Sequence, residues 1–166
     1  MAESEHDREQ TPWRVELSSP EAMEALGARL ARESGPGLTV YLSGDLGAGK
    51  TTLVRGFLRG LGYQGPVRSP TFTLVEPYTL EGRRVYHFDL YRLSDPEELE
   101  FLGIRDYLDP DSMRLIEWPQ RGLGLIPEPD LIVNIAYSSH GRRLEWTSGS
   151  ERGTRLIRRI QCDNKL

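Results

Sequence analysis

The sequence has very little cysteine: among 166 residues, Cys162 is the only thiol. A single thiol cannot form a disulfide within the chain, and no group of Cys and His residues has the spacing of a structural zinc site. Cys162 is therefore interpreted as an inert residue of the C-terminal tail. A chain of this length can enclose one sizeable hydrophobic core but hardly two, so the sequence predicts a single domain stabilised without disulfides or zinc.

Long hydrophobic runs are also absent. The longest apolar segments have about the length of a β-strand, far below the ~20 residues that a membrane-spanning helix needs. Residues 1–10 are polar and lack the charged and then apolar order of a secretory signal. The sequence thus predicts a soluble, cytoplasmic protein that does not enter a membrane.

The chain lacks an excess of positive charge as well. It carries 21 Lys and Arg residues against 25 Asp and Glu residues, a formal net charge of −4. Unaided binding of nucleic acid requires positive charge, overall or in a strong local patch, so any role with RNA is expected to act through partners. A basic series near the C-terminus is interpreted as the solvated face of a last helix, with contact to an acidic partner or RNA as the alternative. Its members are Arg152, Arg155, Arg158, Arg159 and Lys165.

What the chain does contain is a complete phosphate-binding motif. Residues 44–51 read Gly-Asp-Leu-Gly-Ala-Gly-Lys-Thr and match G-x-x-x-x-G-K-[ST]. The glycines allow successive N–H groups to surround phosphate oxygens, Lys50 is placed to reach the β- and γ-phosphates, and Thr51 offers its hydroxyl to Mg²⁺. The motif therefore predicts binding of a nucleoside triphosphate. The residues expected at the phosphates are Gly44, Asp45, Leu46, Gly47, Ala48, Gly49, Lys50, Thr51 and Thr52.

The flanks of this motif have the strand and the helix that the motif requires. Residues 38–42 form an apolar run typical of a buried strand. After the motif, apolar residues recur at helical spacing until Gly60 and Gly62 close the pattern. A glycine-rich turn that happens to precede a lysine is the alternative, and the order of strand, loop and helix disfavours it. The apolar face consists of Leu53, Val54, Phe57, Leu58 and Leu61.

The whole chain predicts an α/β protein with a P-loop NTPase fold: a mixed, mainly parallel sheet flanked by helices, with an antiparallel hairpin. Residues 1–12 are interpreted as a disordered leader, residues 13–148 as a single P-loop ATPase domain, and residues 149–166 as a C-terminal helix or basic tail. Ser19 and Pro20 have the pattern of a helix start. Further strands are expected at residues 13–17, 73–78, 84–90, 112–118, 131–137 and 142–147, with short helices after residue 94 and at 104–108.

Two acidic residues are positioned to complete a nucleotide site. Glu117 ends a strand and resembles a Walker B acid, so it is expected to bind Mg²⁺ together with Thr51. Asp89 lies in a second strand, where alternation places His87, Asp89 and Tyr91 on one face, a group suited to hold a water molecule. The sequence leaves open which acid is the direct metal ligand. His87 is interpreted as a structural histidine, with orientation of Asp89 or of a water as the alternative.

The segment after the motif helix carries a conformational constraint. Pro70 restricts Ser69 to extended geometry, which gives the Thr71 hydroxyl a defined direction. Arg68 and Arg92 could each stabilise charge in a transition state, and a partner could equally supply that group. Spacing in the sequence does not choose among these three sources.

Four motifs in this order resemble the TsaE family, formerly YjeE, the small P-loop ATPases of bacterial tRNA threonylcarbamoyladenosine synthesis. They are Gly-Asp-Leu-Gly-Ala-Gly-Lys-Thr-Thr at 44–52, Ser-Pro-Thr-Phe at 69–72, His-Phe-Asp-Leu-Tyr-Arg at 87–92 and Ile-Glu-Trp-Pro at 116–119. The resemblance covers roughly residues 18–119 and departs in the leader and the arginine-rich tail.

The resemblance implies ATP and Mg²⁺ as cofactors, with Lys50 and Thr51 on the phosphates and the metal. It implies a nucleotide-responsive switch segment at Thr71 and a requirement for Asp89 and Glu117 in hydrolysis. It also implies that the ATPase resets the TsaB–TsaD complex, which transfers threonylcarbamoyl to a tRNA adenosine. The chain would then reach tRNA only indirectly.

Other functions use similar residues. A small-molecule kinase needs an acceptor pocket and an arginine-bearing lid, yet the stretch after Glu117 is short and interrupted by proline. A GTPase would carry an Asn-Lys-x-Asp segment, which the sequence lacks. A nucleotide-dependent adaptor with little turnover remains an alternative, because a switch segment can transmit binding without hydrolysis.

Overall fold

The computed structural model describes residues 11–162, which form a single seven-stranded sheet covered on both faces. Its strands are β1 (Trp13–Leu17), β2 (Thr39–Gly44), β3 (Val75–Leu80), β4 (Arg83–Asp89), β5 (Met113–Glu117), β6 (Leu131–Ser138) and β7 (Gly141–Ser148). They lie in the order β1-β7-β6-β2-β5-β4-β3. The central strands β6, β2, β5 and β4 run parallel, while β7 and β3 pair antiparallel with their neighbours. The mixed α/β class predicted from the sequence is confirmed.

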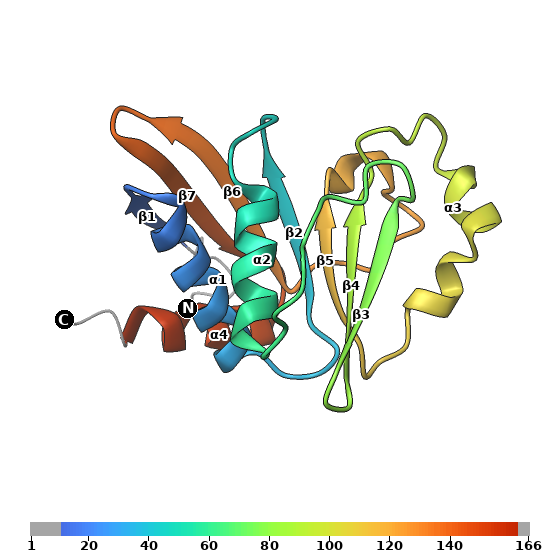
Figure 1. Cartoon of the computed structure of the whole chain (residues 1–166), viewed down its shortest axis with the longest axis horizontal. Helices are drawn as coiled ribbons and strands as arrows, with labels where there is room; N and C mark the ends of the chain where they lie inside the picture. The colour runs from blue at the N-terminus through green and yellow to red at the C-terminus, as the bar shows by residue number, and fades with distance from the viewer. Residues whose placement is uncertain (1–10, 163–166) are drawn as a thin grey trace, which may run out of the picture.

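Helices cover the two faces of the sheet unequally (Figure 1). One face carries the longer helices α1 (Pro20–Glu33), α2 (Lys50–Gly60) and α4 (Glu151–Cys162). The other carries α3 (Glu97–Leu102) and the short 3₁₀ helices η1 (Ile104–Tyr107) and η2 (Pro119–Arg121). Strand β2 serves both layers, because Val40 and Leu42 point into the first core and Tyr41 into the second. A continuous apolar run, as at residues 38–42, is the sequence expected of such a central strand.

The helix start predicted at Ser19 is present. The Ser19 hydroxyl accepts a hydrogen bond from the Ala22 backbone N–H at 3.1 Å, and Pro20 occupies the first turn. Met23, Leu26 and Leu30 face the core. This cap fixes where α1 begins, and the residues just before it lie next to the phosphate-binding loop.

The C-terminal segment is helical and belongs to the first core, where Leu156 and Ile160 of α4 are buried. The Arg159 side chain donates to the Glu33 carbonyl at 3.2 Å, and Arg152 donates to the Pro36 carbonyl. These two residues of the basic face thus also contact the chain at and just after the end of α1, while Arg159 remains exposed, as expected for a solvated face. Arg155 and Arg158 are exposed, as expected. Residues 1–10 of the predicted leader, which was assigned to residues 1–12, and Lys165 lie outside the described residues.

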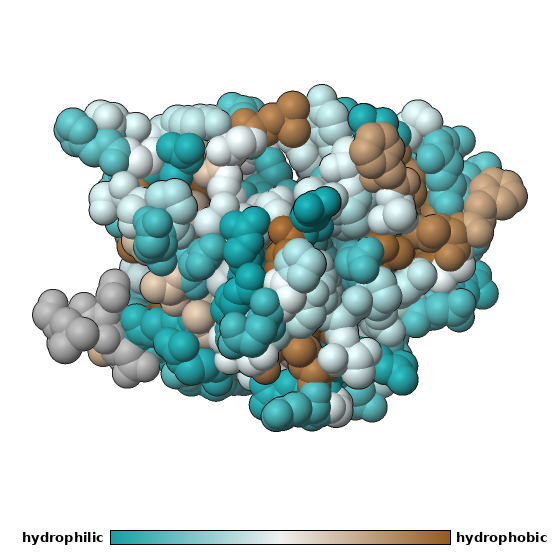
Figure 2. All heavy atoms as spheres, viewed as in Figure 1, coloured by the Kyte–Doolittle hydropathy of each residue, from teal (hydrophilic) through white to brown (hydrophobic). Residues whose placement is uncertain are grey.

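The surface over α1 and α2 is largely hydrophilic, and apolar side chains gather toward the β3 and α3 end of the molecule (Figure 2). Phe72 and Phe101 are the most exposed large apolar residues in the described part of the chain. Within residues 11–162, no helix has both the length and the hydrophobicity needed to cross a membrane.

Glycine permits an unusually close contact between α1 and α2, and this contact sets the position of the phosphate-binding loop. A Cβ atom built on Gly56 of α2 would lie 2.1 Å from the Glu24 carbonyl oxygen of α1. A Cβ built on Gly27 of α1 would lie 2.3 Å from the Leu53 carbonyl oxygen of α2. The backbones of the two helices therefore touch, which holds the start of α2 against α1.

We predict that Gly56→Ala lowers the free energy of unfolding by about 1–3 kcal/mol, because the added methyl group forces the two backbones apart. Urea unfolding followed by circular dichroism measures this change. Gly35→Ala is the matched control, since its Cβ meets only the Arg152 side chain at 3.5 Å. Equal stability of the two variants would contradict the close contact.

Candidate functional site

The loop between β2 and α2 has the conformation of a phosphate cradle. Gly47 and Gly49 have φ values of 80° and 119°, in the left-handed region that favours glycine. Gly49 precedes α2 without any side-chain cap, so the first N–H groups of this helix are not engaged by a capping side chain. Free N–H groups and the positive end of the helix dipole together favour an anion at this point. The structure thus places the predicted motif where a strand ends and a helix begins.

Lys50 is a buried cation whose hydrogen bonds within residues 11–162 all go to the loop itself. Its Nζ donates to the carbonyl oxygens of Gly44 at 2.5 Å and Asp45 at 3.0 Å. Burial lowers the pKa of the ammonium group, whereas the carboxylates of Glu117 and Asp89 act in the opposite direction. Since neutral carbonyls are weaker partners than phosphate oxygens, this ammonium group is ready to exchange them for an anion.

The two predicted acids lie side by side at the carboxyl ends of neighbouring parallel strands. Asp89 of β4 is in register with Glu117 of β5, and Glu117 is in register with Leu42 of β2. Both carboxylates are buried. The Thr51 hydroxyl lies 3.4 Å from Glu117 Oε2. Ligands of open α/β sheets bind outside the carboxyl ends of the strands, and here these ends lie next to the loop.

His87 contacts Glu117. The His87 ring is completely buried, and its Nε2 lies 2.5 Å from Glu117 Oε2. Orientation of Asp89 by His87, considered from the sequence, is therefore wrong, because the histidine contacts the carboxylate of the adjacent strand. The predicted alternation holds for His87 and Asp89 but not for Tyr91, since β4 ends at Asp89. This contact with His87 holds the Glu117 carboxylate in position at the site.

Asp89 is held by the segment that contains Thr71. Its Oδ2 accepts hydrogen bonds from the hydroxyls of Ser69 and, at 3.4 Å, Thr71. Its Oδ1 accepts from the Tyr91 backbone N–H at 3.0 Å. Sequence reasoning assigned no role to Ser69, although the constraint of Pro70 on its geometry was a usable signal. These contacts tie the predicted switch segment directly to a site acid.

Trp118 adopts a strained backbone that directs its ring into the site. Its φ of 58° is in the left-handed region, which is unfavourable for a large side chain and is found at functional sites. The Lys50 Nζ lies 4.7 Å from the centroid of the indole ring. The ring is therefore close enough to the lysine for a cation–π contact.

These side chains converge on one cavity. It is lined by Leu46, Gly47, Gly49, Lys50, Thr51, Thr52, Ser69, Thr71, Asp89, Glu117 and Trp118. Of the predicted phosphate-binding residues, Gly44, Asp45 and Ala48 do not line this cavity, although the carbonyls of Gly44 and Asp45 accept hydrogen bonds from Lys50. Arg68 and Arg92 do not line it; the Arg92 guanidinium lies over the Phe72 ring at 4.1 Å.

The donor set suits Mg²⁺ bound together with phosphate. Among residues 11–162, no group of three or more His, Cys, Asp or Glu side chains could hold a metal alone. Mg²⁺ is commonly bound by one or two carboxylates, with phosphate oxygens and waters completing its shell. Thr51 and Glu117 supply two suitable oxygens, so these residues fit a metal that arrives with the nucleotide.

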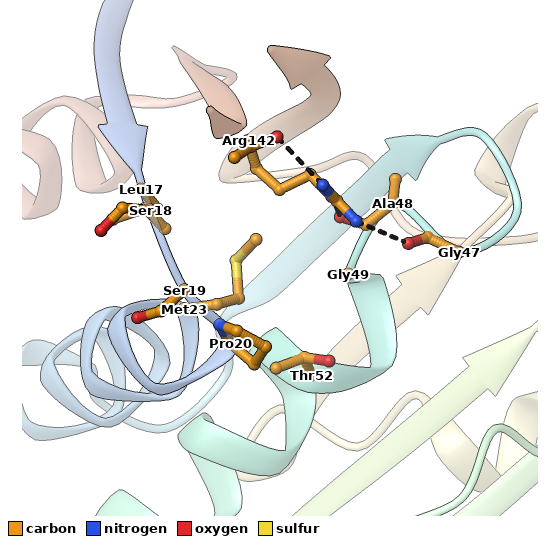
Figure 3. Close-up of a pocket in the computed structure, with 11 residues that line it drawn as sticks. Leu17, Ser18, Ser19, Pro20, Met23, Gly47, Ala48, Gly49, Thr52 and Arg142 are labelled. Atoms are coloured by element: carbon orange, nitrogen blue, oxygen red, sulfur yellow. Dashed lines mark hydrogen bonds between the residues drawn. The ribbon is translucent and has the colours of Figure 1, made fainter. Parts of the chain in front are cut away.

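A second cavity lies at the P-loop toward β7 and was not predicted (Figure 3). The residues that line it are Leu17, Ser18, Ser19, Pro20, Met23, Gly47, Ala48, Gly49, Thr52, Gly141 and Arg142. They come from three distant parts of the chain, and no local spacing relates them. Arg142 donates to the Ala48 carbonyl at 2.9 Å, which connects β7 to the loop.

The family model and the curated relatives that match this chain all carry the same family name. The family model "Threonylcarbamoyl adenosine biosynthesis protein TsaE" matches residues 17–144. The tRNA threonylcarbamoyladenosine biosynthesis protein TsaE of Haemophilus influenzae is 58% identical over 120 residues, covering 72% of this chain and 76% of that protein. The protein of the same name from Bacillus subtilis is 41% identical over 134 residues, covering 81% and 82% of the two chains.

A solved structure shows the same architecture. The crystal structure of Bacillus subtilis YdiB superimposes with a TM-score of 0.76 at 29% identity, covering 93% of this chain and 95% of that one. The four motifs that suggested the family from the sequence all lie within the matched residues. The chain therefore belongs to the TsaE family of threonylcarbamoyladenosine biosynthesis proteins and has the P-loop nucleotide-binding fold.

Proposed function

We propose that the protein binds and hydrolyses MgATP, and that this cycle acts on the TsaB–TsaD complex during cytoplasmic synthesis of tRNA threonylcarbamoyladenosine. The observation that carries the proposal is the convergence of a phosphate-binding loop, a buried lysine and two buried carboxylates on one cavity. Family membership supports the tRNA modification pathway. The net charge of −4 favours contact with tRNA through the partner complex.

Different residues of the cavity bind the phosphates and the metal. The loop N–H groups and the start of α2 hold the phosphate oxygens, and Lys50 turns from the loop carbonyls to the β- and γ-phosphates. Thr51 and Glu117 hold the metal, directly or through water. When bound there, Mg²⁺ neutralises the charge that develops on the phosphates during transfer. His87 keeps the Glu117 carboxylate in place for this role.

We assign Asp89 to the attacking water. Its carboxylate is buried beside the cavity and is held by Ser69, Thr71 and the Tyr91 backbone. A carboxylate held in this way can orient a water molecule and accept its hydrogen bond as the oxygen approaches the γ-phosphorus. Because Thr71 contacts the same acid, order in the switch segment and correct placement of Asp89 depend on each other.

The proposal is tested by measuring phosphate release from MgATP with and without TsaB–TsaD. We expect release that requires Mg²⁺ and changes in rate when the complex is added. An adaptor would bind both MgATP and TsaB–TsaD but release no phosphate. A small-molecule kinase would transfer the phosphate to an added acceptor instead of water. Either of these outcomes would replace hydrolysis as the function of the site.

Lys50→Ala should greatly weaken ATP binding, because it removes the side-chain cation of the loop that can reach the β- and γ-phosphates. A loss of about 10²-fold corresponds to the ~3 kcal/mol expected at most for one charge-assisted hydrogen bond. Isothermal titration calorimetry measures this affinity. Arg14→Ala, which changes an exposed cation on β1, is the control and should bind normally. Unchanged affinity in Lys50→Ala would refute the P-loop assignment.

Asp89→Asn and Glu117→Gln should have different effects, although both remove one buried carboxylate. Glu117→Gln should weaken Mg²⁺ binding and hydrolysis together, because it removes a metal ligand. Asp89→Asn should leave MgATP binding nearly normal and lower turnover by ~10²–10⁴-fold, the loss typical of a positioned acid–base group. Mg²⁺ titrations of ATP binding and single-turnover hydrolysis separate the two effects. The reverse pattern would exchange the two assignments.

The switch role of Thr71 predicts nucleotide-dependent protection from hydrogen exchange. Backbone amides of residues 67–73 should exchange more slowly with an ATP analogue that resists hydrolysis than with ADP, because only the former carries a γ-phosphate to order the segment. Helix α3, which packs against the opposite face of the sheet, is the internal control and should not change. Equal protection of residues 67–73 with both nucleotides would remove the switch role.

A further inference from the structure

A basic groove lies at the opposite end of β2 from the nucleotide site. Helix α4 packs against α1 (Figure 1), and the groove runs between the last turn of α1 and one face of α4. Leu38, which precedes β2, lines the groove, whereas the P-loop follows the other end of this strand. The groove has a volume of about 320 Å³. Among the described residues, none lines both this groove and either cavity beside the P-loop.

Positive charge dominates the basic groove. Arg32, Arg152, Arg155 and Arg159 line it, and Glu33 is the one acid among the described residues that does so. None of the four guanidinium groups forms an ion pair with a carboxylate of residues 11–162. The whole chain has a formal net charge of −4, so the groove differs in sign from the protein as a whole. Positive charge concentrated in a hollow attracts anions.

Two of these arginines are held in place by backbone carbonyls. The Arg152 guanidinium donates to the Pro36 carbonyl, and Arg159 Nη1 donates to the Glu33 carbonyl at 3.2 Å. A Cβ atom built on Gly37 would lie 3.1 Å from Arg152 Nη1, so the glycine leaves room for the guanidinium. Each group uses one hydrogen bond within residues 11–162, which leaves most of its N–H donors for a ligand. Because both side chains are already ordered, they lose less conformational entropy when an anion binds.

The arginines of α4 form a row whose spacing matches an extended peptide. Arg152, Arg155 and Arg159 lie three and four residues apart, which places them on one face of the helix. The helix rises ~6 Å from Arg155 to Arg159. In an extended peptide, side chains two residues apart point to the same side and lie ~7 Å from each other. Carboxylates at alternate positions of such a peptide can therefore each meet one arginine.

We propose that the basic groove binds an acidic segment of a partner protein, in extended form and with carboxylates at alternate residues. Arginine pairs with carboxylates through two parallel hydrogen bonds, which gives such a contact its direction. RNA fits the groove less well. Single strands are held largely by stacking of bases on aromatic rings, and the groove has no aromatic residue in the described part of the chain. A single phosphate ion is too small to span the row of arginines.

The test uses a synthetic peptide of three Glu-Ser repeats with blocked ends, titrated into the full chain by calorimetry at low salt. A peptide of three Gln-Ser repeats is the uncharged control. We expect the acidic peptide to bind wild type and the control peptide to bind at least tenfold more weakly. The absence of binding up to about 1 mM acidic peptide would overturn the proposal.

A double variant tests whether the groove is the site. Arg32→Ala with Arg155→Ala should bind the acidic peptide about tenfold more weakly, as expected for two partly exposed ion pairs. Both side chains are exposed and make no hydrogen bond within residues 11–162, so the fold should be retained. Arg83→Ala with Arg84→Ala removes two exposed cations of β4 and changes the net charge equally. This control should bind normally, and equal weakening in both double variants would mean non-specific attraction.

NMR of ¹⁵N-labelled wild type locates the peptide without any variant. Amide signals of residues 32–38 and 151–159 should shift, and shifts confined to other residues would overturn the proposal. Tighter binding of a uridine hexanucleotide at the same residues would make RNA the ligand. Complete displacement of the peptide by an equal concentration of inorganic phosphate would make the groove a small-anion site. Binding that appears only after removal of residues 1–10 would mean that the chain's own N-terminal segment occupies the groove.

The inference does not depend on the proposed ATPase cycle. MgATP affinity should be the same in wild type and in both double variants, because the groove and the P-loop lie at opposite ends of β2. Loss of peptide binding with normal MgATP binding would therefore confirm a separate site. Loss of both in Arg32→Ala with Arg155→Ala would instead mean that these arginines support the fold, and it would overturn the proposal.

Discussion

The site depends on a buried ammonium group that faces two buried carboxylates. The Lys50, Asp89 and Glu117 side chains are each at least 95% buried, and burial of unpaired charges would be strongly unfavourable. Bonds from Lys50 to the loop carbonyls, from Ser69 to Asp89 and from His87 to Glu117 compensate these charges. The magnesium triphosphate proposed to bind here would bring negative phosphates to the lysine and a cation to the acids. The same hydrogen bonds therefore offset the cost of burying these charges in the free protein, and the site is suited to the nucleotide.

The sheet and the packing of α1 against α2 position the side chains of Lys50, Asp89 and Glu117. Because β4, β5 and β2 pair in parallel, their carboxyl ends lie together at one end of the sheet, where Asp89 and Glu117 are in register. The close contact of α1 and α2 through Gly27 and Gly56 holds the start of α2 near the carboxyl ends of these strands. The β6–β7 hairpin then supports the loop from outside through Tyr137 and Arg142. The position of the loop thus depends on contacts with α1, α2 and the β6–β7 hairpin.

Local patterns were enough to predict the loop, the strands and the positions of Asp89 and Glu117 at strand ends, because each of these is encoded within a few residues. Apolar runs mark the central strands, and the acid after an apolar run marks a strand end. The contacts that join these parts were not predictable in the same way. Ser69 and Asp89 are 20 residues apart, His87 and Glu117 are 30 apart, and Ala48 and Arg142 are 94 apart. Their pairing depends on strand order, which no single segment encodes.

The claim that Lys50 exchanges the carbonyls of Gly44 and Asp45 for phosphate oxygens has an unusually direct test. Lys50 and Lys165 are the two lysines of the sequence, so ¹⁵N-lysine labelling gives two side-chain ammonium signals, and Lys165→Arg assigns them. Burial and hydrogen bonding slow proton exchange at Lys50, which makes its signal observable by NMR. We predict that saturating MgATP shifts the Lys50 signal strongly and that AMP, which lacks the β- and γ-phosphates, does not. A Lys50 signal that stays unchanged at saturating MgATP would contradict this account.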